Sequence, residues 1–357
     1  MKLGISVGLL ALALAGGCSK KKDQAGDKTS GTGSAASVTG GGSATAAGSG
    51  SAATPEAPKP DPKLVERGDY LASILGCGFC HMPMGPQGPD TTRQFAGGLE
   101  VPEKFGTWRA PNITPHTGSG IGNWTEEQIV TAIREGTRPD GSKLLPIMPY
   151  LNYNRLTDDD AKAIAAYLKT VPAIDNVVAP NKDLKIPPIP APKPANAPDV
   201  VDDPLKHGEY LVTLMHCNMC HTPMTKDGMP DMARMYGGGM EFEIPFLGTG
   251  TLYGPNISSD PETGIGKWTE QQVADVIKTM KRPDGTIIQG PMQFYLAGWS
   301  KLEDRDVKAI AAYVKTIPPI KNKVPKSTFK PHQGPPPGAG GDGAGSAAAG
   351  SAAAPTK

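Results

Sequence analysis

The chain lacks the features that mark several common classes of protein. Its 357 residues include five cysteines, its strand signals are weak throughout, and its N-terminal apolar run is too short to cross a bilayer. Basic residues do not gather in the segments expected to fold: residues 61–175 hold 11 basic and 14 acidic residues, and residues 200–320 hold 11 and 15. A nucleic-acid-binding protein concentrates positive charge on a folded face, so we exclude that class.

The N-terminal residues are typical of an exported protein. Residues 1–17 are predicted to be a signal peptide, with a lysine near the start, a short apolar run and two glycines before Cys18. The pattern resembles a bacterial lipoprotein signal, in which Cys18 becomes the lipidated first residue of the mature chain. An ordinary cleaved signal would instead leave a free thiol. Both alternatives place the protein outside the cytoplasm, and lipidation would anchor it to a membrane, facing the periplasm.

Three further segments lack the apolar periodicity of a folded domain. Residues 18–60 are rich in lysine and then in Gly, Ser, Thr and Ala, and they are expected to form a disordered tether. Residues 177–200 are rich in proline and are expected to form an extended linker that separates two modules. Residues 321–357 are expected to form a disordered tail.

The remaining sequence is an internal repeat, which defines module 1 (residues 61–176) and module 2 (residues 201–320). Residues 67–81 match residues 207–221 at an offset of 140. Two further pairs match at offsets of 144 and 146: "PNITPHTGSGIGNWTEEQIVTAIREGTRPDG" with "PNISSDPETGIGKWTEQQVADVIKTMKRPDG", and "LTDDDAKAIAAYLKTVPAI" with "LEDRDVKAIAAYVKTIPPI". Three collinear matches predict one fold used twice, with the insertions in loops.

Helix-start signals recur in both modules. A capping carboxylate stands before a proline at Asp61–Pro62 and at Asp203–Pro204. A Thr–Gln capping box occurs at Thr125–Gln128 and at Thr269–Gln272. The last helix is capped by Thr157 in module 1 and by either Ser300 or Glu303 in module 2. We therefore predict an all-α fold of two tandem helical modules with long loops. Each module is short of apolar residues for its size, so another group is expected to fill its centre.

The pentapeptide Cys-x-x-Cys-His occurs once in each module, at residues 77–81 and 217–221. Residues i, i+3 and i+4 of a helical turn share a face, so two thiols and an imidazole can point the same way. Haem c needs that arrangement for two thioether bonds and one iron ligand. A thioredoxin-like pair needs a βαβ context, a zinc knuckle needs two more ligands nearby, and neither explains the repeated histidine. We predict two covalently bound haem c groups, held by Cys77, Cys80 and His81 and by Cys217, Cys220 and His221.

The second iron ligand of each haem is predicted to be a methionine. Met148 and Met292 lie 67 and 71 residues after the motif histidines, at matching positions before the last helix, and each has a proline nearby. His116, in a Thr-Pro-Gly loop, is the alternative to Met148. Three other histidines have no repeated partner and are expected to be solvated: His207, His216 and His332.

The chain resembles the bacterial cytochrome c family. It is similar to the haem c subunits that serve periplasmic alcohol and sugar dehydrogenases. The resemblance is carried by the two Cys-x-x-Cys-His motifs, "PNITP" and "PNISSD", "TGIGKWT", "MPYLNY" and "LTDDDAKAIAAYLKTVP". The family implies that four residues lie near haem edges or propionates: Asn112, Asn256, Trp124 and Trp268. We also expect Gly68 with Tyr167, and Gly208 with Tyr313, to mark crossings of the first and last helices.

Histidine and methionine ligation leaves the iron low-spin with no open position. We therefore predict a dihaem carrier of single electrons, not an enzyme, in a periplasmic or membrane-surface electron-transport chain. Its partners would be a redox protein donor and acceptor, such as a dehydrogenase, an oxidase or a reductase. Whether it is a dehydrogenase subunit stays open. The alternative function is that of a dihaem peroxidase, which reduces hydrogen peroxide and needs one haem able to open a coordination site.

Overall fold

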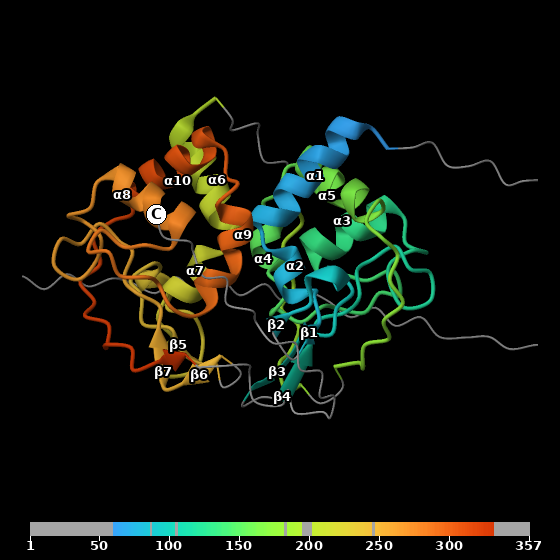
Figure 1. Cartoon of the computed structure of the whole chain (residues 1–357), viewed down its shortest axis with the longest axis horizontal. Helices are drawn as coiled ribbons and strands as arrows, with labels where there is room; N and C mark the ends of the chain where they lie inside the picture. Colours follow the sequence, from blue (N-terminus) through green and yellow to red (C-terminus); the bar gives the residue numbers. More distant parts are fainter. Residues whose placement is uncertain are drawn as a thin grey trace, which may run out of the picture. The chain divides into compact units, whose positions relative to one another are not determined.

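The computed structural model describes residues 60–331, except 86–87, 104–105, 182–183, 195–201 and 245–246 (Figure 1). The described residues belong to one compact unit, Pro58–Lys357. The predicted signal peptide, Cys18, the tether up to residue 59 and His332 lie outside the described residues. Among the helices that are described, none is long and apolar enough to cross a membrane.

Module 1 is mainly helical. Its helices are α1 (Pro62–Ile74), α2 (Cys77–Cys80), α3 (Glu126–Glu135), α4 (Tyr150–Tyr153) and α5 (Asp158–Leu168), with the 3-10 turn η1 (Thr91–Arg93). Two short antiparallel hairpins, which the sequence does not signal, pair β1 (Met84–Gly85) with β2 (Gly88–Pro89) and β3 (Glu100–Glu103) with β4 (Gly106–Arg109). In the second hairpin Glu100 faces Arg109.

Module 2 repeats this arrangement. Its helices are α6 (Pro204–Leu214), α7 (Cys217–His221), α8 (Glu270–Thr279), α9 (Leu296–Trp299) and α10 (Asp304–Thr316), with the 3-10 turns η2 (Met232–Arg234) and η3 (Pro291–Tyr295). Antiparallel pairs join β5 (Glu241–Glu243) to β7 (Thr251–Tyr253) and β6 (Gly248–Thr249) to β8 (Lys330–Pro331). The prediction of a mainly helical fold used twice is confirmed, with these small hairpins added.

The helices begin where the sequence predicts. The Asp61 side chain accepts a hydrogen bond from the amide of Lys63, and the capping boxes opened by Thr125 and Thr269 are complete in α3 and α8. Thr157 caps α5, whereas the equivalent helix α10 begins after Glu303, whose side chain makes no capping hydrogen bond. Local capping residues therefore explain most helix starts, but α10 needs another partner for its first amides.

In each module the first and last helices cross at a glycine. Helix α1 packs against α5, and α6 packs against α10. A Cβ atom added at Gly68 would lie 2.0 Å from the carbonyl oxygen of Ala163 and 2.6 Å from Cβ of Tyr167. At Gly208 the added Cβ atom would lie 2.7 Å from Cβ of Tyr313. The predicted crossing points are confirmed, since only glycine allows such close approach of the helices.

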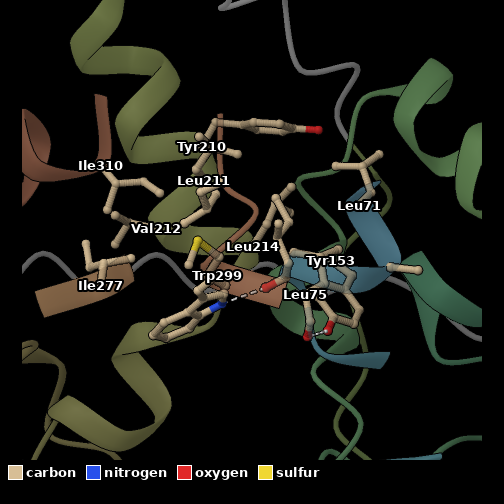
Figure 2. Close-up of a cluster of buried hydrophobic side chains, with 14 of the residues drawn as sticks. Leu71, Leu75, Tyr153, Tyr210, Leu211, Val212, Leu214, Ile277, Trp299 and Ile310 are labelled. Carbon is tan, nitrogen blue, oxygen red and sulfur yellow. Dashed lines mark hydrogen bonds between the residues drawn. The ribbon is translucent and has the colours of Figure 1, made fainter. Parts of the chain in front are cut away.

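The two modules share one hydrophobic core. Helix α9 of module 2 lies against α1 of module 1 (Figure 1), and α4 of module 1 lies against α6. Figure 2 shows Leu71 and Leu75 of module 1 in one cluster with Leu214 and Trp299 of module 2. The Trp299 indole nitrogen also donates a hydrogen bond to the carbonyl of Ile74, at 2.9 Å. The two halves are therefore packed directly on each other.

Two tyrosines reach reciprocally from one module to the other. Tyr70 on α1 donates its hydroxyl to Asp306 on α10 at 2.6 Å, and Tyr210 on α6 donates to Asp160 on α5 at 2.7 Å. Each hydroxyl also accepts a hydrogen bond from the residue that caps the other module's last helix. The Thr157 amide lies 3.2 Å from the Tyr210 oxygen, and the Glu303 amide lies 3.3 Å from the Tyr70 oxygen. In both modules the tyrosine therefore binds the backbone of the residue that directly precedes the other module's last helix.

Each of these carboxylates has a second partner within its own module. Arg67 donates to Asp160 from Nε and Nη2, at 2.8 and 3.0 Å. His207 places Nε2 2.7 Å from Asp306 Oδ1 and is 1% exposed, so the expectation that it is solvated is wrong. Burial by itself would raise the pKa of Asp306, but hydrogen bonds from His207 and Tyr70 lower that pKa below its usual value.

Two segments outside the predicted modules pack against them, the proline-rich linker and the residues that follow module 2. In the linker, the Asn181 side chain binds the backbone of Arg109, and Pro192 accepts a hydrogen bond from Asn154 at 2.8 Å. The described part of the linker contains no helix or strand, but it lies against module 1 through these contacts. Residues 321–331 lie along module 2, where Thr328 donates its amide to the carbonyl of Thr251 at 2.9 Å. The ordered chain therefore extends beyond the expected boundary at residue 320.

Candidate haem sites

Both Cys-x-x-Cys-His motifs lie on short helical turns at the ends of the first helices of their modules. Helix α2 begins at Cys77 and α7 at Cys217. Each turn is preceded by a residue in the left-handed conformation, Gly76 with φ 71° and His216 with φ 44°. This residue reverses the chain between the first helix and the motif. The side chains at i, i+3 and i+4 are thus presented in the same way twice.

The four motif cysteines are free thiols in half-buried positions. Burial raises the pKa of Cys77, Cys80 and Cys217 to about 12 and that of Cys220 to about 11. A redox-active Cys-x-x-Cys pair needs a thiol with a lowered pKa, so these surroundings do not suit that chemistry. They present pairs of uncharged sulfur atoms on one turn. These sulfurs stand for the thioether sulfurs of the haem-loaded protein.

The two motif histidines are buried and held in one orientation. His81 places Nδ1 2.7 Å from the carbonyl oxygen of Pro111, and His221 places Nδ1 2.8 Å from that of Pro255. A carbonyl can only accept, so Nδ1 carries the proton and Nε2 keeps its lone pair for a metal. Burial lowers the pKa of both imidazoles, which favours this neutral form. The residues present therefore fit a haem iron.

The carbonyls of Pro111 and Pro255 are positioning groups that the sequence did not identify. They belong to the repeated "PNI" segments, whose recurrence is the signal that could have found them. Asn112 and Asn256 in the same segments hold the loops. The Asn112 amide donates to the carbonyl of Ile174 at 2.8 Å, and Asn256 donates to that of Ile320 at 2.7 Å. These contacts give both asparagines a loop-closing role, and the position near a haem edge that the resemblance implied stays a prediction.

The candidate methionine ligands take equivalent places before the last helices. Met148 lies just before α4, and Met292 lies in η3. Both side chains are partly buried and pack against the hydrophobic core, as Cys77 and Cys217 do. Trp124 and Trp268 pack against the same core. The structure therefore brings motif cysteines, methionines and tryptophans to one apolar interior.

Two further histidines among the described residues, His116 and His216, have partners of their own. His116, the alternative to Met148, places Nδ1 2.8 Å from the Ser119 hydroxyl and 3.6 Å from Asp175 in its loop. His216 was expected to be solvated, which is wrong: its ring lies against Tyr153 and Tyr295, with centroids 6.3 and 5.7 Å apart. Burial lowers the pKa of His216 to about 4, so the ring is neutral at pH 7.

Each module thus has a buried imidazole whose Nε2 can bind iron, next to a pair of thiols that can bond to a haem. This arrangement, present twice, is typical of a protein that binds two haems covalently. The sequence model of the cytochrome c family matches residues 65–172 and 205–318, one match in each module. The chain belongs to the cytochrome c family.

Similar proteins include haem subunits of dehydrogenases. The chain is 33% identical over 297 residues to the cytochrome c subunit of alcohol dehydrogenase (quinone) from Gluconacetobacter polyoxogenes, covering 78% of this chain and 61% of that protein. It is 35% identical over 273 residues to the fructose dehydrogenase cytochrome subunit from Gluconobacter japonicus, covering 71% and 52%. It is 32% identical over 284 residues to a diheme cytochrome c-type protein from Cereibacter sphaeroides, covering 73% and 91%.

The family matches and the dihaem relative show that the protein binds two c-type haems, with cysteines in the motifs at residues 77–80 and 217–220. They support a role in haem-based electron transfer and give no support to the peroxidase alternative. The chain spans about three fifths of the length of the alcohol dehydrogenase subunits that it matches.

Proposed function

We propose that the protein is a dihaem electron carrier, held at a membrane surface outside the cytoplasm, that passes single electrons from a dehydrogenase to a membrane oxidase or reductase. The observation that carries this proposal is the presence of two matching haem sites in one packed unit. In each site a buried imidazole is oriented by a proline carbonyl, at 2.7 Å for His81 and 2.8 Å for His221.

The residues have distinct roles in this proposal. The haem supplies a one-electron Fe(III)/Fe(II) couple. Cys77 and Cys80 would hold the first haem and Cys217 and Cys220 the second, while Nε2 of His81 and of His221 would bind the irons. The sulfur atoms of Met148 and Met292 would be the second protein ligands and would favour Fe(II). Two protein ligands to each iron would leave no open position for peroxide.

The cellular setting rests on the N-terminal sequence and on the relatives. Residues 1–17 and Cys18 have the pattern of a lipoprotein signal. A lipid at Cys18 would tether the haem modules near a membrane-bound partner and raise their local concentration there. Several similar proteins are cytochrome subunits of dehydrogenases, which makes a dehydrogenase the proposed donor. Mass spectrometry of the membrane fraction tests the anchor, because a Cys18→Ala variant should lose both the lipid mass and membrane association.

A spectroscopic redox titration of the purified protein tests the carrier function. The wild type should show two reversible one-electron transitions and a sulfur-to-iron charge-transfer band. Met148→Ala and Met292→Ala should each remove one haem's share of that band, whereas Met232→Ala, at a position 62% exposed, should leave it intact. An intact band in Met148→Ala would refute that ligand and direct attention to His116. Haems that do not cycle reversibly would refute the carrier function.

A further inference from the structure

Aromatic side chains fill the region between the two haem-attachment motifs. Phe79 is the second of the two residues between Cys77 and Cys80 of the first motif, and Phe294 and Tyr295 end η3 of module 2. The rings of Phe79 and Phe294 are stacked, with centroids 4.3 Å apart and planes inclined by 16°. The centroid of Tyr295 lies 5.9 Å from that of Phe79. Module 2 therefore contacts the interior of the first motif directly.

Tyr295 reaches the second motif as well. Its ring centroid lies 5.7 Å from that of His216, which directly precedes Cys217. On another side the ring stacks on Trp299 at 5.1 Å, and Trp299 is bonded to module 1 through the carbonyl of Ile74. Tyr295 thus contacts both motif segments, and it stacks on Trp299, which is hydrogen-bonded to the other module.

The residue before the first motif leaves room for the Tyr295 ring. A Cβ atom at Gly76 would lie 2.3 Å from Cε1 of Tyr295, so the glycine before the first motif allows the ring to pack against the chain there. The equivalent residue before the second motif is His216, which contacts the same ring. Tyr150, the aromatic residue that follows Met148 in module 1, is turned elsewhere and donates its hydroxyl to the carbonyl of Ile189 at 2.7 Å.

Tyr295 is buried between segments of both motifs. Its ring contacts Phe79, which directly precedes Cys80, and His216, which directly precedes Cys217. Burial raises the pKa of Tyr295 well above its usual value. Each haem would be bonded to cysteines next to these contacts, at Cys80 in the first motif and at Cys217 in the second. The interface between the modules therefore brings the two motif segments together.

We propose that Tyr295, with Phe79 packed beside it, is the contact through which electrons pass between the two haems. This inference rests on the proposed electron-transfer function. In each transfer one iron changes from Fe(II) to Fe(III) while the other changes from Fe(III) to Fe(II), and no bond or proton is exchanged. Close-packed atoms couple two redox centres better than an empty gap or loosely held water, so the volume of the ring matters more than its hydroxyl.

The intramolecular electron exchange rate of partly oxidised protein tests this proposal. It is read from the widths of the paramagnetically shifted haem-methyl signals in NMR spectra, extrapolated to low protein concentration. Tyr295→Leu should slow the exchange severalfold, and Tyr295→Phe should retain the wild-type rate. Tyr167→Leu is the matched control, because its ring contacts Phe95 within module 1, with centroids 5.9 Å apart.

Electron paramagnetic resonance of the fully oxidised variants separates this role from simple bracing of the modules. The magnetic coupling between the two irons should be the same in Tyr295→Leu and in wild type, which shows that their spacing is unchanged. An unchanged exchange rate in Tyr295→Leu, or a slower rate accompanied by altered magnetic coupling, would overturn the proposal while leaving the carrier function intact. Failure of the wild-type haems to cycle reversibly would overturn both.

Discussion

The reciprocal tyrosines give a direct measure of how strongly the modules hold each other. In Tyr70→Phe the fully buried Asp306 loses the hydroxyl that lies 2.6 Å from Oδ2, and the Glu303 amide loses its acceptor. A hydrogen bond to a charged group contributes about 1.5–3 kcal/mol, and a buried acceptor left without a donor costs the upper part of that range. We therefore expect Tyr70→Phe to lower the free energy of unfolding by about 2–3 kcal/mol.

The equivalent change in module 2, Tyr210→Phe, should lower the free energy of unfolding by less. Tyr210→Phe removes a hydroxyl 2.7 Å from Asp160 Oδ2, but Arg67 still donates to that oxygen at 3.0 Å. We expect a loss of about 1–2 kcal/mol. Tyr313→Phe is the matched control on α10, because its hydroxyl takes no part in these two contacts, and its effect should stay within about 0.5 kcal/mol.

Urea unfolding of the haem-loaded protein, followed by circular dichroism, measures all three variants at pH 7. In thermal melts the Tyr70→Phe loss corresponds to a Tm decrease of about 4–12 °C, at about 2–4 °C per kcal/mol for chains of this size class. The order of destabilisation should be Tyr70, then Tyr210, then Tyr313. If Tyr70→Phe is no more destabilised than the control, the hydroxyl contacts do not stabilise the junction and the reasoning is refuted.

The remaining predictions concern packing, capping and pH. Gly208→Ala should destabilise the protein by about 3 kcal/mol or more, because its Cβ would lie 2.1 Å from the carbonyl oxygen of Ala309. Gly85→Ala should be nearly neutral in the same urea titration, because its Cβ would lie 3.5 Å from the nearest atom, the carbonyl oxygen of Gly88. Thr269→Ala should cost about 1 kcal/mol by removing the capping box of α8, measured by the same unfolding curves. The lowered pKa of Asp306 adds stability that is complete above about pH 4, the unfolded value, and is lost as the pH falls through the folded pKa. Unfolding between pH 7 and pH 3 should therefore show a steeper acid loss in wild type than in Asp306→Asn.

Features that depend on neighbouring residues could be predicted from the sequence. The capping box of Thr125 needs only Gln128, three positions later, and both contacts form. Gly68 and Gly208 stand at equivalent places in the repeat, which identified them as helix crossings. The motif turns follow from the spacing of Cys77, Cys80 and His81 alone. Each of these signals is contained within one helix or one repeated segment.

Contacts between the modules could not be predicted in this way. Tyr70 and Asp306 are 236 positions apart, and a tyrosine on a helix face has the same local pattern whether it meets water or another module. His207 lacked a repeated partner because Arg67 stands at its position in module 1, although both side chains bind equivalent carboxylates, Asp306 and Asp160. His216 lacked one because the equivalent residue is Gly76. Tyr295 carried no signal, since its neighbours Phe79 and His216 belong to segments that are brought together only by the packing of the two halves.

The exchange of hydroxyls described for Tyr70 and Tyr210 makes the duplicated halves dependent on each other. Expressed by itself, either half would keep its carboxylate and lose the phenol that completes it, and it would expose the apolar surface that surrounds Trp299 or Leu71. Separating the halves would therefore destabilise both of them, and neither module is expected to fold by itself as stably as it does in the pair.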